Sequence, residues 1–318
     1  MKNMNEKIFK FVCDEDTEEI RIDRLLAELN SDLSRSYIKK LIDAESALVN
    51  GKPVKASFIP KAGDELILRV PESTLPDIAA EDIPLDIIYE DEDVIIINKP
   101  KNMVVHPAPG NYSGTIVNAL MYHCKDNLSG INGILRPGIV HRIDKDTTGV
   151  IMAAKNDISH RCLADQLKVH SITRRYRAIC FGTFKEKEAT VDAPIGRNNL
   201  DRKKMSINRV NGKEAITHYR VLASSEEHKL SYIECVLETG RTHQIRVHMA
   251  SIGHPLLGDT VYGGERRENL KIFGQELNGQ CLHAMVLGFI HPSTNEYMEF
   301  SAELPAYFQN ILSHLNNE

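Results

Sequence analysis

The chain has 318 residues, 42% of them hydrophobic and 26% charged, so it has room for one large domain and one small domain. No apolar run reaches about 18 residues, which argues against a transmembrane helix and a membrane partner, and the first residues are too polar for a secretory signal peptide. The six cysteines are scattered without a C-x-x-C pair, which argues against a zinc site or a disulfide framework and predicts a cytoplasmic protein.

Charge is unevenly distributed along the chain. The formal net charge is −5, yet residues 135–177 contain nine Lys or Arg against four acidic residues, and residues 197–213 contain six against one. Residues 72–93 contain nine acidic residues and neither Lys nor Arg. Binding to an RNA backbone requires local basic clusters of this kind, although a solvated surface can carry them too. Composition alone therefore leaves RNA binding open.

We expect residues 1–17 to form a flexible tail and residues 18–71 to form a small α/β unit. Apolar residues recur at helical spacing in two segments of this unit, and Asn50-Gly51 predicts a hairpin between short strands. The segment GDELILRV then predicts a strand. Basic residues surround the exposed side of the second predicted helix: Arg35, Lys39 and Lys40.

The pattern R-x-D-x-x-L, LSRS, V-N-G-K and G-D occurs in this order in the small unit. It is similar to the pattern of the small RNA-binding domain of the ribosomal-protein-S-four type. The resemblance implies that the unit binds RNA, with Arg35, Lys39 and Lys40 as contacts.

Residues 72–85 are acidic and rich in proline, which predicts a linker, and residues 86–318 then form the larger domain. Segments such as DVIIINKP, YRAICFGTF and LSYIECVLETG predict strands, with a few helices between them and no strict alternation of strand and helix. This order favours an α+β fold with a mainly antiparallel β-sheet over a doubly wound parallel one.

The stretch RPGIVHRIDKDTTGVIMAAKN places a polar cluster directly before an apolar run that predicts a buried strand. Asp144 lies between Arg142 and Lys145, and nearby positive charge keeps a carboxylate ionised. Such a carboxylate can act as a nucleophile, as a base or as a stabiliser of a sugar cation. A turn or capping role for Asp144 explains the residue equally well when it is considered alone.

The segment HRIDKDTTG resembles the catalytic motif of the RluA/RluD family of pseudouridine synthases. Other segments of the chain also look like family motifs and occur in family order. NKPKNMVVHP and GNYSGTIVNAL come before this segment, and RRYRAIC, LETGRTHQIRVHMASIGHPLLGD, VYGG and CLHA come after it. The resemblance implies a catalytic domain of the pseudouridine synthase type that isomerises uridine to pseudouridine in RNA without a cofactor or metal. It also implies large-subunit (23S) ribosomal RNA, or its assembly precursor, as the partner.

The resemblance makes Asp144 the essential aspartate, and whether it attacks C1′ of the ribose or removes the C2′ proton stays open. Arg241 resembles the family arginine that pairs with this aspartate, and Tyr176 resembles the tyrosine that stacks on the target base. Arg142 resembles the residue that enters the space left by a flipped nucleotide. We expect His141 to support the loop, and Leu282 and His283 to line the pocket.

Four more basic residues are candidate phosphate contacts: Arg174, Arg175, Lys203 and Lys204. A non-catalytic RNA-binding protein of ribosome assembly remains an alternative, since basic clusters and a small RNA-binding unit fit it as well. The trio of Asp144, Tyr176 and Arg241 favours the enzyme, because binding alone does not require it. The chain lacks the glycine-rich loop of a kinase, and no second carboxylate is evident to serve as the general acid of a glycosidase. We expect a monomer by default.

Overall fold

The structure is a computed structural model that describes the chain except for residues 1–5, 15, 16, 18, 31, 32, 34, 72–77, 109, 126, 132–135, 199, 202, 203, 264–269 and 316–318. The chain divides into two compact units, Met1–Asp77 and Ile78–Glu318. In the described part, no helix is both long and apolar enough to cross a membrane.

The smaller unit is a four-stranded antiparallel sheet with two helices packed on it. The strand order is β1 (Glu6–Val12), β4 (Glu65–Pro71), β2 (Ala47–Val49), β3 (Lys52–Pro53), and the helices are α1 (Ile22–Leu29) and α2 (Arg35–Asp43). Each helix buries three apolar residues in the core of this unit: Ile22, Leu25 and Leu26 of α1, and Ile38, Leu41 and Ile42 of α2. Asn50 and Gly51 have φ angles of 48° and 76°, which is the positive-φ pair that a tight hairpin turn requires.

Two of the predicted boundaries are wrong. Residues 6–12 lie in the predicted tail but form β1, which pairs with β4 along its whole length, from Glu6–Pro71 to Val12–Glu65. Phe9 and Phe11 pack against the small core and thereby fix this strand. Of the predicted linker, residues 72–77 lie outside the described residues, whereas Ile78 is buried in the core of the larger unit.

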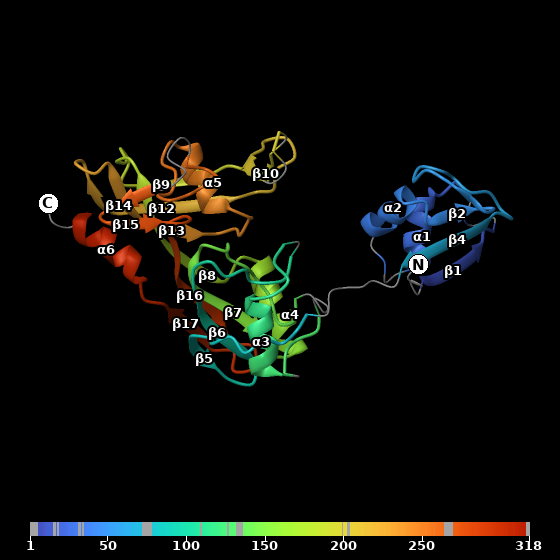
Figure 1. Cartoon of the computed structure of the whole chain (residues 1–318), viewed down its shortest axis with the longest axis horizontal. Helices are drawn as coiled ribbons and strands as arrows, with labels where there is room; N and C mark the ends of the chain where they lie inside the picture. The colour runs from blue at the N-terminus through green and yellow to red at the C-terminus, as the bar shows by residue number, and fades with distance from the viewer. Residues whose placement is uncertain are drawn as a thin grey trace. The chain divides into compact units, whose positions relative to one another are not determined.

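The larger unit is built on a nine-stranded sheet (Figure 1). Eight strands follow the order β5 (Ile87–Glu90), β6 (Val94–Lys99), β7 (Thr148–Ala154), β16 (Leu282–Ile290), β8 (Thr173–Phe181), β13 (Leu230–Leu237), β12 (Ile216–Ser225) and β9 (Glu188–Asp192), and β17 (Tyr297–Ser301) pairs with β16. All the pairings are antiparallel except that of β7 with β16. The predicted α+β fold with a mainly antiparallel sheet is therefore confirmed.

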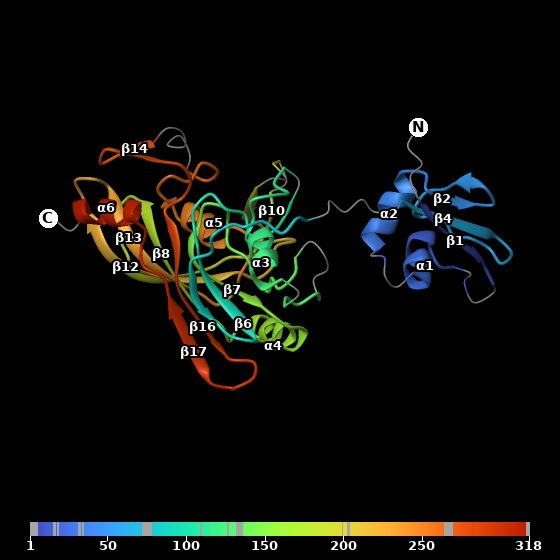
Figure 2. The same cartoon turned by 60° about the horizontal axis from the view of Figure 1, so that its bottom comes forward.

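Helices and small hairpins complete this unit (Figure 2). They are α3 (Ile116–Cys124), α4 (Asp157–Lys168), α5 (Gln244–Ser251), α6 (Ala306–Leu315), and the strand pairs β10 (Ile195–Arg197) with β11 (Met205–Ile207) and β14 (Leu270–Ile272) with β15 (Gln275–Leu277). The apolar residues of β6 alternate between two cores: Ile95 and Ile97 face the core that contains α3, and Val94 and Ile96 face the core that contains α4. Burial on both faces explains why this segment is an unbroken apolar run.

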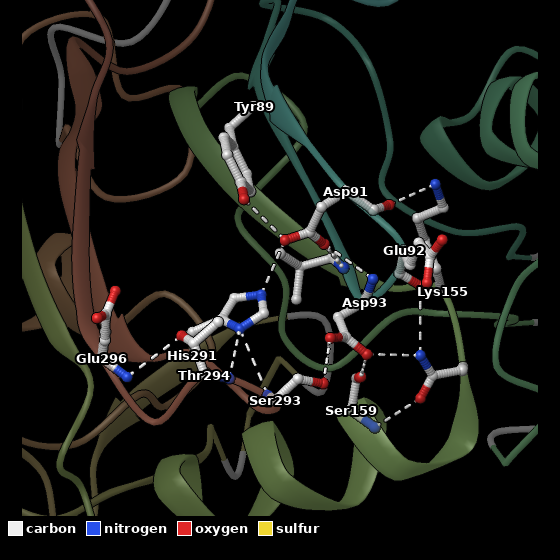
Figure 3. A network of polar contacts seen from close by, with 12 residues as sticks. Tyr89, Asp91, Glu92, Asp93, Lys155, Ser159, His291, Ser293, Thr294 and Glu296 are labelled. Atoms are coloured by element: carbon white, nitrogen blue, oxygen red, sulfur yellow. Dashed lines mark hydrogen bonds and ion pairs between the residues drawn. The ribbon is translucent and has the colours of Figure 1, made fainter.

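A polar network joins the turn between β5 and β6 to the first turn of α4 and to the loop that follows β16 (Figure 3). Asp91 accepts hydrogen bonds from Tyr89 Oη at 2.8 Å and from His291 Nε2 at 2.9 Å, and Asp93 accepts one from Ser159 Oγ at 2.6 Å. The other carboxylate oxygens of the two aspartates accept hydrogens from Asp93 N, Val94 N and Ser293 Oγ. Every carboxylate oxygen of the two aspartates accepts a protein hydrogen, so the cluster ties these segments of the chain together.

Gly149 shows how closely β7 and β16 approach each other. Its φ angle is 105°, and a Cβ atom there would lie 2.1 Å from the carbonyl oxygen of Ala284 on β16. We therefore expect Gly149→Ala to lower the free energy of unfolding by about 2–5 kcal/mol, because both backbone strain and overpacking oppose it. Gly130→Ala is the control, since nothing lies within 4 Å of a Cβ there. Urea denaturation of both variants measures the difference, and equal stabilities would contradict the packing argument.

Candidate active site

The polar loop that precedes β7 carries Asp144, whose side chain is 17% exposed. The loop closes on itself, because Thr147 N donates a hydrogen bond to Asp144 O at 3.1 Å. Half-buried His141 accepts one through Nε2 from Met152 N at 3.1 Å. Burial lowers the pKa of His141 to about 3, so the ring is neutral, and its hydrogen bond joins the loop to β7.

Lys99 fixes the same loop through a hydrogen bond to one of its backbone carbonyl oxygens. It is fully buried, and its Nζ donates to three carbonyl oxygens, those of Pro100 at 2.7 Å, Met103 at 2.9 Å and Lys145 at 2.9 Å. Burial lowers the pKa of Lys99 to about 7, while Asp146 and Asp144 oppose this shift. The ammonium group thereby joins the end of β6 to the residue next to Asp144.

Arg246 is the cation that pairs with Asp144. Its Nη1 donates to Asp144 Oδ2 at 2.9 Å, while its Nε and Nη2 donate to the two oxygens of Asp259 at 2.8 Å and 2.9 Å. Asp259 is 1% exposed, so this fork is desolvated. Burial opposes the charged forms, but the ion pairs prevail: they raise the pKa of Arg246 and hold the pKa of Asp259 below its usual range.

The prediction that Arg241 pairs with Asp144 is therefore wrong. Arg241 lies in the loop before α5, and its Nε donates to the backbone oxygen of Glu214 at 2.8 Å. Its own backbone N donates to Gln244 Oε1 at 2.9 Å, which fixes the loop against the helix. Arg246 lies within α5 itself, between buried Ile245 and Val247. The two arginines lie in one motif, and no local signal in the sequence distinguishes their roles.

His243 and Tyr262 complete the surroundings of Asp144, and the sequence analysis assigned neither of them. His243 has φ 58° and ψ 23°, a left-handed conformation that is uncommon for a residue other than glycine. Its Nε2 lies 3.8 Å from Asp144 Oδ1, and its Nδ1 lies 2.8 Å from Tyr262 Oη. Tyr262 Oη accepts a hydrogen bond from Met205 N at 2.9 Å. The hydroxyl hydrogen is thus available to Nδ1, which leaves the Nε2 hydrogen facing Asp144.

These groups surround a cavity of about 60 Å³. Asp144, Tyr176 and Arg241 all line it, so the structure brings the predicted trio together around one space. Tyr176 is 9% exposed, and burial raises the pKa of its phenol, which is therefore protonated at neutral pH. Leu282 also lines the cavity. Arg142 is exposed and borders this cavity and two neighbouring ones, of about 290 Å³ and 320 Å³.

His283 does not line the cavity, which corrects the prediction. It follows Leu282 in β16, and neighbouring residues of a strand point to opposite faces of the sheet. His283 is fully buried, with Nδ1 2.8 Å from Thr148 Oγ1 and Nε2 3.0 Å from Ala302 O. Burial lowers the pKa of this imidazole. It is a neutral part of the core.

The same alternation separates the two predicted phosphate contacts on β8. Arg174 is 7% exposed, and its Nη2 donates to Glu238 O at 2.7 Å, so it is a buried cation and not a plain surface charge. Arg175 points the other way and forms an ion pair with Glu299 at 3.0 Å. Lys203 lies outside the described residues, and Lys204 Nζ lies 3.8 Å from Asp201.

In the small unit, Arg35 has a structural partner. Its Nη2 donates to Asp23 at 2.8 Å, and the side chain of Asp23 is 5% exposed. Lys39 and Lys40 are exposed on α2, as expected. The ion pair gives Arg35 a part in joining α1 to α2, whereas the two lysines remain open to a ligand.

Comparison with known proteins identifies the family of the chain. Residues 93–251 match the family model of RNA pseudouridylate synthase, and residues 20–66 match that of the S4 domain. The chain therefore belongs to the RNA pseudouridylate synthase family. It is an enzyme of the type that isomerises uridine in RNA, and it carries an S4 domain before its catalytic unit.

Two curated relatives extend over nearly the whole chain. An uncharacterized RNA pseudouridine synthase, YlyB of Bacillus subtilis, is 49% identical, with 95% of this chain and 96% of the relative covered. The ribosomal large subunit pseudouridine synthase D of Zymomonas mobilis is 46% identical, with 94% and 96% covered. Among solved structures, human RNA pseudouridylate synthase domain containing 4 matches with a TM-score of 0.56 and 26% identity, covering 72% of this chain and 92% of that one.

The two arginines can be told apart by matched substitutions. Arg246→Lys removes the fork to Asp259 and weakens the contact to Asp144, so we expect the single-turnover rate of pseudouridine formation to fall about 100- to 1,000-fold. Arg241→Lys keeps a cation in the cavity without touching the Asp144 pair, and we expect the rate to stay within about threefold. Quench-flow measurements on both variants test this. A rate loss confined to Arg241→Lys would restore the pairing expected from the sequence.

Tyr262→Phe removes the hydroxyl that links Met205 to His243. We expect kcat to fall about fivefold with little change in KM, which corresponds to one hydrogen bond of about 1 kcal/mol lost next to Asp144. Steady-state kinetics measure the two constants. Tyr122→Phe is the control, because Tyr122 is 49% exposed on α3, and it should leave both constants unchanged. An unaltered kcat in Tyr262→Phe would show that the link plays no part in catalysis.

Proposed function

We propose that this protein converts uridine to pseudouridine in large-subunit (23S) ribosomal RNA or its assembly precursor, with Asp144 as the reacting carboxylate. The observation that carries the proposal is the carboxylate of Asp144, held by buried Arg246 at a cavity that Tyr176 also lines. Two similarities support the choice of RNA: the S4 domain, and relatives named ribosomal large subunit pseudouridine synthase D at 41–46% identity.

The isomerisation breaks the bond between N1 of uracil and C1′, turns the base, and joins C5 to C1′. The hydrogen on C5 leaves as a proton, and N1 gains a proton, so no redox partner or group donor is needed. This balance supports a reaction without a cofactor. Arg246 occupies Oδ2 of Asp144, which leaves Oδ1 as the oxygen for the ribose, whether it attacks C1′ or removes the C2′ proton.

Arg246 and His243 prepare that oxygen for either route. The fork to Asp259 fixes the guanidinium before substrate arrives, so little reorganisation is needed during the reaction. Burial lowers the pKa of His243, and a neutral imidazole beside Oδ1 does not neutralise the carboxylate.

Tyr176 and Arg142 suit the handling of the base. The ring of Tyr176 forms a wall of the cavity, where an aromatic face can stack on uracil. Its phenol is protonated at neutral pH, so Tyr176 in its resting state is not a phenolate base for the C5 proton. Arg142 is exposed at the junction of three cavities, the place from which a side chain can replace a flipped base.

The protein is further proposed to act as a cytoplasmic monomer. The location is supported by bacterial relatives whose names refer to the ribosomal large subunit, and the monomer is the default expectation for a single chain. Sedimentation equilibrium of the active protein tests the oligomeric state, and a dimer at working concentration would overturn it.

Tritium release from RNA labelled at uridine C5 tests the main proposal. We expect tritium release from large-subunit ribosomal RNA to stop at a fixed number of modified sites per transcript. With Asp144→Asn, which keeps the shape of the side chain and removes its charge, the rate of release should be at least about 1,000-fold lower. Asp146→Asn removes a charge from the same loop and should stay within about tenfold of wild type.

Three outcomes of this test would contradict the proposal. Release that persists with Asp144→Asn would remove this residue from the chemistry. Release confined to small-subunit or transfer RNA would overturn the proposed substrate. Tight RNA binding with no release from any RNA would favour the non-catalytic assembly protein.

A further inference from the structure

A second cavity, of about 320 Å³, adjoins the Asp144 cavity. The two share Arg142, Tyr176, Leu237 and Arg241, so a molecule bound in one lies against residues that line the other. Arg174 and His170 line only the second cavity. We refer to this second cavity as the cationic cleft.

The cationic cleft gathers positive charge without a counter-charge. Three arginines line it, Arg142, Arg174 and Arg241, and no Asp or Glu is among its described lining residues. Where the structure pairs these guanidiniums, it pairs them with neutral carbonyls: Arg174 with Glu238 O and Arg241 with Glu214 O. In a chain with a net charge of −5, such a concentration of cations is local and specific.

Arg174 is built into the fold as a buried cation. It is 7% exposed, and its Nε has no hydrogen-bond partner among the described residues. Buried charges are normally paired, because desolvation of an unpaired ion costs several kcal/mol. A bound anion would supply the missing partner of this group.

Gly240 makes room for that guanidinium. A Cβ atom at this position would lie 2.6 Å from Arg174 Nη1, so the guanidinium of Arg174 occupies the space that a side chain at residue 240 would take. Arg174 thereby lies beside the loop that carries Arg241, and both arginines line the cleft.

We propose that the cationic cleft binds a backbone phosphodiester of the RNA, that of the target nucleotide or of its immediate neighbour. The inference rests on the proposed function, which places the target uridine in the adjoining cavity. Guanidinium groups donate paired hydrogen bonds that match the oxygens of a phosphate. Anchoring this phosphate would hold the flipped nucleotide in register with Asp144 without contacting a base, so it would position the substrate for any sequence.

The test uses a set of stem-loop RNA substrates, each with one neutral methylphosphonate linkage at a defined position around the target uridine. With the wild-type enzyme, we expect one linkage to raise KM about 10- to 100-fold, which corresponds to the loss of a charge-assisted contact, and the other linkages to have small effects. The kcat should change little, since the phosphate positions the substrate and takes no part in bond breaking.

Arg174→Gln and Arg175→Gln form a matched pair for this test. They remove the same charge from adjacent positions, but Arg175 lies on the opposite face of β8 and pairs with Glu299. In Arg174→Gln, the sensitive linkage should lose its effect, with the ratio of KM values close to one. In Arg175→Gln, the wild-type pattern should persist. If thermal melting shows that Arg174→Gln does not fold, exposed Arg142→Gln takes its place in the same comparison.

The proposal would be overturned if no single linkage raised KM in the wild type, or if the sensitive linkage kept its effect in Arg174→Gln and in Arg142→Gln. Free phosphate is a separate source of the same chemistry, and inhibition by millimolar inorganic phosphate with no linkage effect would indicate an adventitious anion site. Tritium release from unmodified RNA reports on the proposed function independently, because it requires no neutral linkage. Failure of the cleft and failure of the isomerase are thereby distinguishable.

Discussion

The arrangement of the active site depends on one buried guanidinium, that of Arg246, which lies between two carboxylates. Its fork to Asp259 at 2.8 Å and 2.9 Å satisfies a buried acid, and its remaining nitrogen reaches Asp144. Asp259 also accepts hydrogen bonds from the backbone N–H groups of Val261 and Tyr262. One charge therefore joins α5 and the loop that follows it to the carboxylate of Asp144, which lies 102 residues before Arg246 in the chain.

Tyr262 ties this ion-pair system to the rest of the unit. The guanidinium carbon of Arg246 lies 5.1 Å from the centroid of the Tyr262 ring. The hydroxyl of Tyr262 joins His243 to Met205 on the β10–β11 hairpin. Lys99 fixes the loop that carries Asp144 through its hydrogen bond to Lys145 O. The carboxylate and its loop are thus held by groups that have hydrogen-bond partners of their own, which is how a site becomes preorganised.

Strand alternation decides which neighbouring residues serve the site. Leu282 and Arg174 face the two cavities, whereas His283 and Arg175, one position further along their strands, face the core and Glu299. A shift of one residue in either strand would exchange the two members of each pair. The close pairing of Gly149 with Ala284 helps to fix the register of β16 against β7.

The sequence by itself determined the class of fold, the polar loop around Asp144 and the family, because local periodicity and ordered motifs are properties of the chain alone. It placed the helices and the hairpin of the S4 domain for the same reason. It misplaced β1, since a short strand with two phenylalanines has no signal until its partner β4 is known.

Only the tertiary structure decided which arginine meets Asp144. Arg241 and Arg246 are five positions apart in one motif, and both are candidates until the start of α5 and the position of Asp259 are known. The same holds for His243, Tyr262 and the cationic cleft, whose members come from separate strands and loops. Ion pairs and cavities depend on distances between residues remote in sequence, and those distances exist only after the sheet has closed and its register is set.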